Sequence, residues 1–472
     1  MKYPALIILT CALGCHGFRD PSLSEAKETE VHKVDTANMA TLSSKASVKQ
    51  FYASRDNVLF WSAANSLSPL ADSVLSMITK ARRLGLDPNC YHANELKELM
   101  SDSLMTNRLQ RIDILITDAW LTMYSHVRFG QLDPRSFSPR NWALSVNKDA
   151  IEALKVIDTY TVTQLIRNIE PPFKQYHDLK KILQAFNGPG LDSLQVEQAR
   201  KIALNMERWR WQKALPSRYI SVNIPAFMLR VHEADSLWLQ TKVIVGKRAT
   251  PTPVMESIIR SFTIYPYWHV PKSISTQEIL PNLQRDRHYL RRNNFDVLDA
   301  KGTVILADTI QWDFYSRENF PFVLRQREGS ENSMGIIKFD FANNYNVYLH
   351  DTNSKRLYQQ SRRDLSHGCV RVSDAVGLAH YLVREDDIYV SPEDLDQYLS
   401  LQQRLKIDLR KPIPLRLEYF TVEVIEGVPA FYEDIYKKDS AMSAALNQKV
   451  TNKTLVRYAA SEGKSLLPGA RE

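Results

Sequence analysis

The residues with the clearest chemical potential lie in the segment Ser-His-Gly-Cys-Val-Arg-Val, residues 366–372. Cys369 supplies a thiol directly after Gly368, whose missing side chain lets a substrate carbonyl approach the backbone. The amides around Cys369 could then donate to the oxyanion that forms on attack. A thiol is mostly protonated near neutral pH, so a neighbouring base must make it a competent nucleophile.

The candidate base is His350, which ends the segment Asn-Val-Tyr-Leu-His and is expected at the end of a β-strand, a rigid platform for an imidazole. His350 and Cys369 are far enough apart in the chain that only the tertiary fold can bring them together. His367 lies two residues before the nucleophile. In an extended segment such residues share a face but stand roughly 6.6 Å apart. We therefore expect His367 to support the site rather than act as base, unless the chain turns sharply at Gly368.

Other interpretations of these residues are open. A free cysteine is commonly a small buried hydrophobe, although the polar neighbours of Cys369 argue against a core strand. A zinc site with His350, His367 and Cys369 as ligands is disfavoured, because closed structural sites take four ligands, usually with several thiolates. We expect no metal and no cofactor. Cys90 follows Asp-Pro-Asn beside a turn and is interpreted as structural.

The composition is that of a folded protein, with 44% hydrophobic and 24% charged residues. A chain of 472 residues exceeds one ordinary core, so two or three domains are expected. The formal net charge of +8 suits an anionic polymer or a membrane surface, and a scattered surface charge explains it equally well. No Lys/Arg-rich run is interleaved with aromatic residues, so we expect no nucleic-acid partner.

The first residues are typical of an export signal. Lys2 precedes an apolar run from Ala5 to Leu13, which is shorter than the roughly 20 apolar residues that span a bilayer. The following Gly14 and Cys15 complete a segment, Ala-Leu-Gly-Cys, that resembles a bacterial lipobox. We therefore expect residues 1–15 to direct export to the periplasm, with Cys15 as the lipidated first residue of the mature protein. Residues 16–47 then form a flexible tether to the membrane.

Periodicity divides the remaining chain into a helical and a β-rich part. From residue 48 to 216 apolar residues recur at helical spacing, and Gly85-Leu86-Asp87-Pro88 and Gly130 to Pro134 are typical helix stops. Alternating patterns predict strands at 219–223, 226–231, 238–245, 261–265, 346–350, 388–390, 415–424 and 430–432, with a hairpin connection at 233–235. The sequence thus predicts an α+β fold: an all-α domain, 48–216, a mostly β domain, 217–438, and a disordered tail, 439–472.

The Ser-His-Gly-Cys-Val-Arg-Val segment, with His350 upstream, resembles the signature of the YkuD-type L,D-transpeptidases. Further segments follow the order of the large YcbB-like subgroup: 222–227, 243–247, 266–271 and 338–341. The helical part is similar to that subgroup's scaffold domain, so the likeness covers roughly 48–438. It implies a scaffold domain before a mostly β L,D-transpeptidase catalytic domain, in which 268–340 includes a helical flap or capping insert.

The resemblance also implies roles by position. Cys369 matches the acylated nucleophile, His350 the general base and Gly368 the oxyanion region. Tyr348 and Arg371 match residues that line the pocket.

Trp268 matches an aromatic residue on the substrate side of that pocket. For Arg371, a salt bridge that holds the loop is an equally good explanation.

Family members often carry a small peptidoglycan-binding module within the scaffold, but here the chain runs from Pro171 through Phe186 directly to Asn205 without room for one. The tether and the basic surface would then have to bring the protein to the wall.

The implied reaction joins two peptidoglycan stem tetrapeptides, a donor and an acceptor. Cys369 attacks the L-centre carbonyl of the donor's third residue, D-alanine leaves, and the acceptor's side-chain amine converts the thioester into a 3–3 cross-link. Carbapenem β-lactams are implied as acylating inhibitors. The alternatives are an L,D-carboxypeptidase, a lipoprotein-attaching enzyme with the same site, and a non-catalytic wall-associated scaffold, whose mark would be loss of Cys369 or His350.

The lipobox predicts where the protein is found in cell fractions. The wild type should sediment with membranes, because lipoproteins carry more than one acyl chain and bind firmly. Cys15→Ser should instead be soluble or unprocessed, as immunoblots of the fractions would show. A mature protein that begins elsewhere and stays in the soluble fraction would contradict the assignment.

Overall fold

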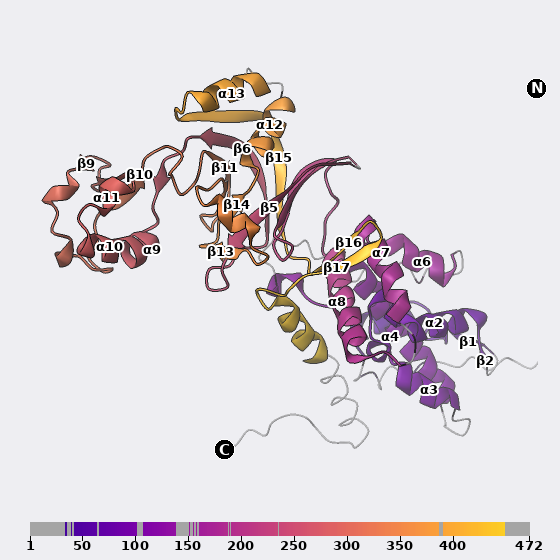
Figure 1. Cartoon of the computed structure of the whole chain (residues 1–472). Helices are drawn as coiled ribbons and strands as arrows, with labels where there is room; N and C mark the ends of the chain where they lie inside the picture. Colours follow the sequence, from indigo (N-terminus) through magenta and orange to yellow (C-terminus); the bar gives the residue numbers. More distant parts are fainter. Residues whose placement is uncertain are drawn as a thin grey trace, which may run out of the picture.

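The computed structural model describes residues 34, 39, 42–63, 66–101, 107–137, 151, 154, 157, 160–186, 188, 190–234, 236–386 and 390–448. Within them a helical region precedes a β-rich region that carries an insert (Figure 1). The predicted α+β class and its domain order are confirmed. The predicted export signal with Cys15 lies outside the described residues. No helix among the described residues is long and apolar enough to cross a membrane.

The helical region packs around one buried helix, α4 (Arg108–Phe129), in which every residue from 112 to 124 is buried. Two of these residues are carboxylates, and each is satisfied by hydrogen bonds. Asp113 accepts from the Tyr52 hydroxyl at 2.6 Å and Asp118 accepts from the Ser44 N–H at 2.6 Å. The other α-helices whose bounds the structure describes in this region are α1 (Lys45–Ala53), α2 (Pro69–Thr79), α3 (Ala93–Ser101), α6 (Val162–Ile169), α7 (Lys174–Leu183) and α8 (Ser193–Arg210).

Asp118 also corrects the predicted extent of the tether. Its carboxylate binds the N–H groups of Ser43 and Ser44, Leu42 is buried, and α1 begins at Lys45. Val34 and Met39 are buried in the same core. The folded part therefore includes residues within 16–47, the range that was expected to be a flexible tether. The Ser/Thr/Lys-rich composition of this segment gave no sign of the fold, because its hydrogen-bond partner, Asp118, lies in the distant helix α4.

The two predicted helix stops are confirmed. Gly85 has φ +68° after the 3-10 turn η1 (Ala81–Leu84), and Gly130 has φ +91° after α4. Each stop is followed by a proline that opens a short 3-10 turn, and the aspartate before it caps that turn. Asp87 and Asp133 each accept from the N–H two residues on, at 3.0 Å.

The β-rich region is a closed sheet. Its strand order is β13-β5-β14-β12-β11-β6-β15-β3-β4, and a further pairing of β4 with β5 closes it into a barrel. The strands are β3 (Arg218–Asn223), β4 (Met228–Glu233), β5 (Ser236–Gly246), β6 (Met255–Ile264), β11 (Ile337–Phe341), β12 (Leu349–His350), β13 (Asp364–Ser366), β14 (Val370–Val372) and β15 (Leu405–Glu418). Helices α12 (Ala375–Arg384) and α13 (Pro392–Ser400) lie at the upper end in Figure 1.

Several predicted strands have different bounds. The strand expected at 346–350 is only Leu349–His350, because Asn346 has φ +53° in a turn. The strand expected at 415–424 is broken: β15 ends at Glu418, and β16 (Val422–Ile425) pairs with β17 (Val428–Phe431) as a separate hairpin. That hairpin packs on the helical region, where Gln175 exchanges two hydrogen bonds with Val424. The prediction at 388–390 falls largely outside the described residues.

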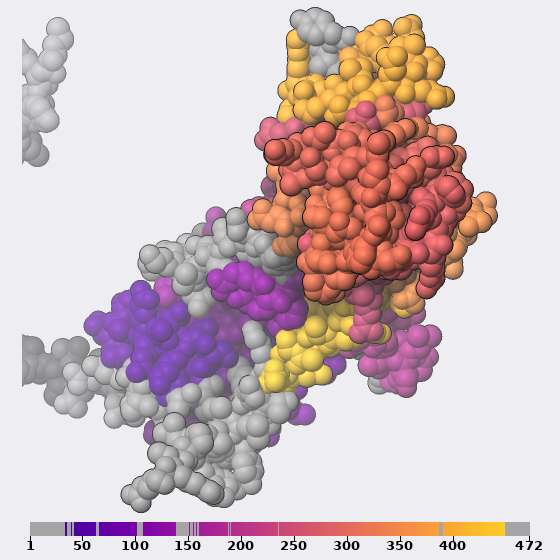
Figure 2. All heavy atoms as spheres, turned by 90° about the vertical axis from the view of Figure 1, so that its left-hand side faces the viewer, coloured from indigo at the N-terminus to yellow at the C-terminus, as the bar shows by residue number. Residues whose placement is uncertain are grey.

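The predicted insert follows β6 and has a small core of its own around Leu283, Trp312 and Leu324. It combines helices with a four-stranded sheet of order β7-β10-β8-β9, which the charged, helix-prone sequence did not indicate. It extends to the left in Figure 1 and faces the viewer, in red and orange, in Figure 2. Its elements are β7 (Trp268–His269), α9 (Lys272–Ile274), the π-helical η5 (Ser275–Ile279), α10 (Leu280–Arg285), α11 (Tyr289–Arg292), β8 (Phe295–Leu298), β9 (Val304–Ile305), the 3-10 turns η6 (Ala307–Thr309) and η7 (Trp312–Phe314), and β10 (Val323–Gln326).

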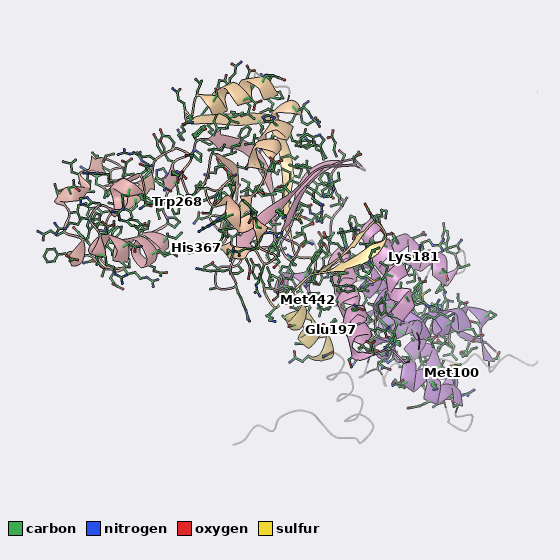
Figure 3. The ribbon with its side chains drawn as sticks, in the orientation of Figure 1. Met100, Lys181, Glu197, Trp268, His367 and Met442 are labelled. Carbon is green, nitrogen blue, oxygen red and sulfur yellow. The ribbon has the colours of Figure 1, made fainter. Side chains whose placement is uncertain are left out.

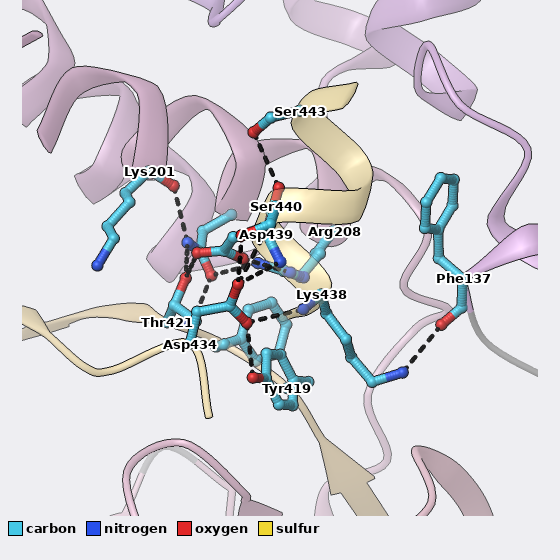
Figure 4. A network of polar contacts seen from close by, with 12 residues as sticks. Phe137, Lys201, Arg208, Tyr419, Thr421, Asp434, Lys438, Asp439, Ser440 and Ser443 are labelled. Atoms are coloured by element: carbon cyan, nitrogen blue, oxygen red, sulfur yellow. Dashed lines mark hydrogen bonds and ion pairs between the residues drawn. The ribbon is translucent and has the colours of Figure 1, made fainter. Parts of the chain in front are cut away.

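The disordered tail predicted from residue 439 is wrong for its first part, because residues 438–448 are helical. Asp439, whose side chain is 1% exposed, forms an ion pair with Arg208 of α8 at 2.5 Å. The Thr421 hydroxyl donates to the other carboxylate oxygen of Asp439 at 2.7 Å (Figure 4). Met442 is also buried against the helical region. This contact with a helix more than two hundred residues earlier could not be read from the local Ala/Ser/Lys composition.

This junction predicts a large loss of stability when its carboxylate is removed. Asp439→Ala should lower the free energy of unfolding by about 3–5 kcal/mol, because Arg208 would be left as a buried, unpaired charge. Glu433→Ala removes an exposed partner of Arg362 and should leave it nearly unchanged, because water and salt screen such pairs. Urea unfolding followed by fluorescence measures both, and similar small effects would show that Asp439 is not structural.

Candidate active site

Cys369 lies in a tight turn between two strands that both pair with β5. Strand β13 pairs with β5 in parallel and β14 in antiparallel fashion, so the chain must turn between them. The Ser366 hydroxyl accepts from the Gly368 N–H at 3.1 Å and donates to the Cys369 carbonyl at 2.6 Å. Gly368 has φ +120°, a conformation that favours glycine. The turn thus fixes Cys369 at the start of β14.

Further residues hold this turn from below. The Thr252 hydroxyl donates to the Gly368 carbonyl at 2.7 Å and accepts from the Gly246 N–H at 2.8 Å. The Tyr436 hydroxyl accepts from the Thr252 N–H at 3.1 Å and donates to the Gly246 carbonyl. A Cβ at Gly246 would lie 2.2 Å from the carbonyl oxygen of Thr250, so no side chain fits there. Sequence reasoning missed Thr252 and Tyr436, because their partners lie far along the chain and leave no local signal. It also missed the role of Ser366, because this segment was expected to be extended and the bonds of Ser366 form only in a turn.

The turn leaves one amide free for a substrate. The Gly368 N–H is already bonded to Ser366, whereas the Cys369 N–H has no hydrogen-bond partner in the described part of the chain. Gly368 therefore shapes the turn, and the amide of Cys369 itself is the available donor for an oxyanion.

The thiol of Cys369 is protonated at neutral pH in this setting. Burial raises its pKa above the usual value, and the backbone and hydroxyl of Tyr348 and the charges of Arg371 and Lys338 offset only part of that rise. A thiol in this state needs a base before it can attack a carbonyl.

His350 is buried in β12, next to Lys338 on β11 and Arg371 on β14. Burial, and next the positive charge of Arg371, lower the pKa of His350 to about 3. The imidazole is thus neutral at pH 7 and able to accept a proton. Its Nδ1 atom is buried and has no hydrogen-bond partner among the residues described.

Tyr348 contacts both members of the predicted pair. Its ring stands edge-on to the His350 ring, with centroids 5.6 Å apart, and its hydroxyl interacts with the Cys369 thiol. Burial and the nearby thiol raise the pKa of Tyr348, so the phenol stays protonated. No direct hydrogen bond joins His350 to Cys369 within the described ranges. The structure therefore gathers the two groups around Tyr348 without an existing proton path between them.

Trp268 also belongs to this group. Its side chain interacts with the Tyr348 hydroxyl, and its ring packs near Phe295 of the insert. The ammonium of Lys338, which sequence analysis did not single out, lies over the Tyr348 ring at 4.9 Å. Lys338 also pairs with Asp340 at 2.5 Å. Figure 3 shows Trp268 where the insert joins the barrel.

Arg371 is half-buried and has no ion-pair partner in the part of the chain that the structure describes. Its Nε atom is buried without a hydrogen bond, and burial lowers the pKa of its guanidinium. The alternative expectation, a salt bridge that holds the loop, is therefore not met. An unpaired guanidinium beside the nucleophile is suited to a carboxylate of the substrate.

His367 points away from the thiol, toward the insert. Its Nε2 atom lies 2.5 Å from the Glu278 carboxylate of η5 and 3.3 Å from the Lys247 ammonium. The extended geometry assumed for residues 367–369 is wrong, because the chain turns there, but the turn also directs His367 away from Cys369. Figure 3 shows His367 facing the insert.

No group of three or more His, Cys, Asp or Glu residues within the described ranges is arranged to hold a metal ion. His367, one of the three ligands weighed for zinc, is directed to Glu278 instead. Cys90, the other thiol in the folded part, is partly buried against the helical core, far in sequence from the residues of the site.

Comparison with known proteins agrees with this arrangement. Residues 46–183 match the family described as "Scaffold domain", and residues 217–390 match the "L,D-transpeptidase catalytic domain", YkuD. A Haemophilus influenzae protein named "Putative L,D-transpeptidase" is 25% identical over 434 residues, which are 90% of this chain and 84% of that protein.

Solved structures align only weakly. The Ldtfm–avibactam carbamoyl enzyme aligns over 43% of this chain and 49% of its own, about half, with 11% identity and a TM-score of 0.18. The catalytic domain of the E. faecium L,D-transpeptidase acylated by ertapenem aligns over 44% and 100%, with 12% identity and a TM-score of 0.18. Scores this low carry no weight for fold or function.

The family matches define the chain as one that carries an L,D-transpeptidase catalytic domain. That domain is of the YkuD family and is preceded by a Scaffold domain, which confirms the resemblance seen in the sequence.

The buried imidazole predicts an acid-sensitive fold. His350 has a pKa of about 3 in the folded state and 6.5 when unfolded, so its contribution to stability is complete above pH 6.5 and is lost as the pH falls toward 3. At pH 5 the loss is about 2 kcal/mol. His350→Gln should therefore lose less stability than the wild type between pH 7.5 and pH 5, measured by thermal unfolding. The lowered pKa of His232 affects both proteins alike and cancels. If the wild type and His350→Gln lost the same amount of stability over this pH range, His350 would be more exposed to solvent than the structure shows.

Proposed function

We propose that this protein is a peptidoglycan L,D-transpeptidase that forms 3–3 cross-links through a thioester on Cys369. The observation that carries this proposal is the fixed turn at Cys369 in a YkuD catalytic domain, with a free amide and an unpaired cation, Arg371, beside the thiol. Nucleophile, oxyanion donor and carboxylate site together suit acyl transfer from an anionic peptide.

In the first step a donor tetrapeptide binds with a carboxylate at Arg371 and its L-centre carbonyl at Cys369. The positive charge of Arg371 lowers the pKa of His350, and the bound carboxylate of the substrate would offset that charge. Substrate binding would therefore raise the pKa of His350 and make it a stronger base. His350 takes the thiol proton, sulfur bonds to the carbonyl carbon, and the carbon–nitrogen bond to D-alanine breaks. The departing amine takes the proton from His350, which leaves a thioester and a neutral imidazole.

In the second step the side-chain amine of an acceptor stem attacks the thioester carbonyl. A carbon–nitrogen bond forms, the carbon–sulfur bond breaks, and His350 passes the amine proton to the thiolate of Cys369. The thiol is thereby regenerated, and no cofactor is consumed. The insert, tied to the turn by His367 and Glu278, lies where it could limit access of water, the competing acceptor.

We also propose that the protein works in the periplasm, held to a membrane by a lipid on Cys15. The apolar segment before Cys15 and the polar segment after it support this location. The fractionation of Cys15→Ser described above tests it independently of catalysis.

The proposed function is tested by the products that the protein forms from tetrapeptide muropeptides. Wild-type protein incubated with purified tetrapeptide muropeptides should release D-alanine and form 3–3 linked dimers, identified by mass spectrometry. Cys369→Ala should abolish both, and Cys90→Ala should leave both nearly unchanged, since Cys90 belongs to the helical core. Release of D-alanine without dimers would indicate a carboxypeptidase, and dimers made by Cys369→Ala would exclude Cys369 as the nucleophile.

The two histidines should differ in their effect on acylation. His350→Ala should slow acylation of Cys369 by roughly 10²–10⁴-fold, as expected when a general base is lost. His367→Ala should be milder, because the contacts that it breaks are with Glu278 and Lys247 and not with the thiol. The rate of mass increase on reaction with a carbapenem measures both at matched thermal stability. A slower reaction for His367→Ala would reverse the assignment.

A further inference from the structure

A cleft of about 450 Å³ lies in the helical region, between α2 and η1 on one side and α6 and α7 on the other. It is remote from the nucleophile. Figure 3 shows Lys181 of α7 and His367 in separate parts of the molecule, with α8 and the barrel between them.

The charged side chains of this cleft are mostly positive: Lys80, Arg83, Arg167 and Lys180 line it with one carboxylate, Glu170. The carboxylate is already used, because Glu170 is 2% exposed and pairs with Lys180 at 2.5 Å. Arg83 and Arg167 are exposed and have no ion-pair partner in the part of the chain that is described. The cleft therefore presents guanidinium groups whose charge nothing in the described protein neutralises.

The walls of the cleft are fixed from inside the domain. Arg210, which is fully buried, donates to the Leu84 carbonyl at 2.5 Å and to the Tyr176 hydroxyl at 3.3 Å. It thereby joins η1 to α7, and its charge is balanced by Glu207 at 3.1 Å. A cleft with buried supports loses little conformational entropy when a ligand binds.

We propose that this cleft binds carboxylate-bearing stretches of peptidoglycan, separately from the stem peptide that reacts at Cys369. The proposal rests on the proposed function, since that supplies the polymer. Guanidinium groups bind carboxylates through paired hydrogen bonds, and free stem peptides repeat such carboxylates along a strand. Hydroxyl and amide side chains, Ser76 and Gln184 among them, suit the sugar and peptide groups between those charges. The volume accommodates a few residues of such a polymer.

Charge reversal in the cleft tests this binding. The full-length Arg83→Glu/Arg167→Glu protein should co-sediment with purified peptidoglycan sacculi at least about tenfold more weakly than the wild type. A matched control, Lys45→Glu/Lys49→Glu, reverses two exposed charges on α1 outside the cleft and should bind as the wild type does. Sacculi whose carboxylates have been amidated should bind the wild type weakly. Both variants should cross-link short soluble tetrapeptides at the wild-type rate.

Other outcomes overturn the proposal. If the cleft variant and the control bind sacculi equally well at matched melting temperature, the cleft does not contribute to binding of the wall. Undiminished binding to amidated sacculi would show that the cleft does not recognise carboxylates. If the cleft arginines mattered for binding to phosphatidylglycerol vesicles, and the protein bound these more tightly than sacculi, the ligand would be a lipid surface.

The experiments distinguish a failure of the proposed cross-linking function from a failure of the proposed peptidoglycan binding in the cleft. Cys369→Ala should keep its affinity for sacculi while it loses cross-linking. If no protein cross-links but binding still depends on Arg83 and Arg167, only the proposed chemistry fails. If cross-linking holds and binding ignores these residues, only the cleft assignment fails.

Discussion

The Thr252 hydroxyl makes the interaction on which the candidate site depends most. It bonds the end of β5 at Gly246 and the turn at Gly368 at once, so the nucleophile keeps a fixed position relative to the barrel. A thiol that must reach a carbonyl while an amide receives the oxyanion tolerates little displacement. The missing side chain of Gly246 allows the close approach, and Tyr436 closes the network. Tyr348, Arg371 and His350 gain their roles only because this turn is held in place.

The segment that contains Tyr436 also joins the two parts of the protein. Tyr436 reaches the turn beneath the nucleophile, and Asp439, three residues later, is paired with Arg208 in α8. The hairpin formed by β16 and β17 adds a second contact, since it leaves the barrel and packs on α7. The helical region is thus in direct contact with the structure that supports the site, and it is more than a spacer.

Sequence reasoning succeeded where the signal was local. The glycine and proline stops at Gly85 and Gly130, the β4–β5 hairpin and the change from helical to alternating periodicity follow from backbone preferences of a few residues, and the structure has them all. The unusual setting of Cys369 was likewise visible in its immediate neighbours. Contacts between distant segments were not predictable in this way. The direction of His367, the support from Thr252 and the folding of residues 438–448 each depend on a partner far along the chain.

Strand β15 has a consequence for how the protein can be divided. It lies between β6 and β3 in the barrel and begins at Leu405, beyond residue 390, where the catalytic family match ends. A fragment cut at that limit would lack the strand that joins the two halves of the barrel, together with Tyr436 beneath the nucleophile. The modules recognisable in the sequence and the units able to fold alone therefore have different boundaries. Recombinant pieces, domain exchanges and insertions should be planned on the strand order, with the catalytic unit carried on to the helix at 438–448.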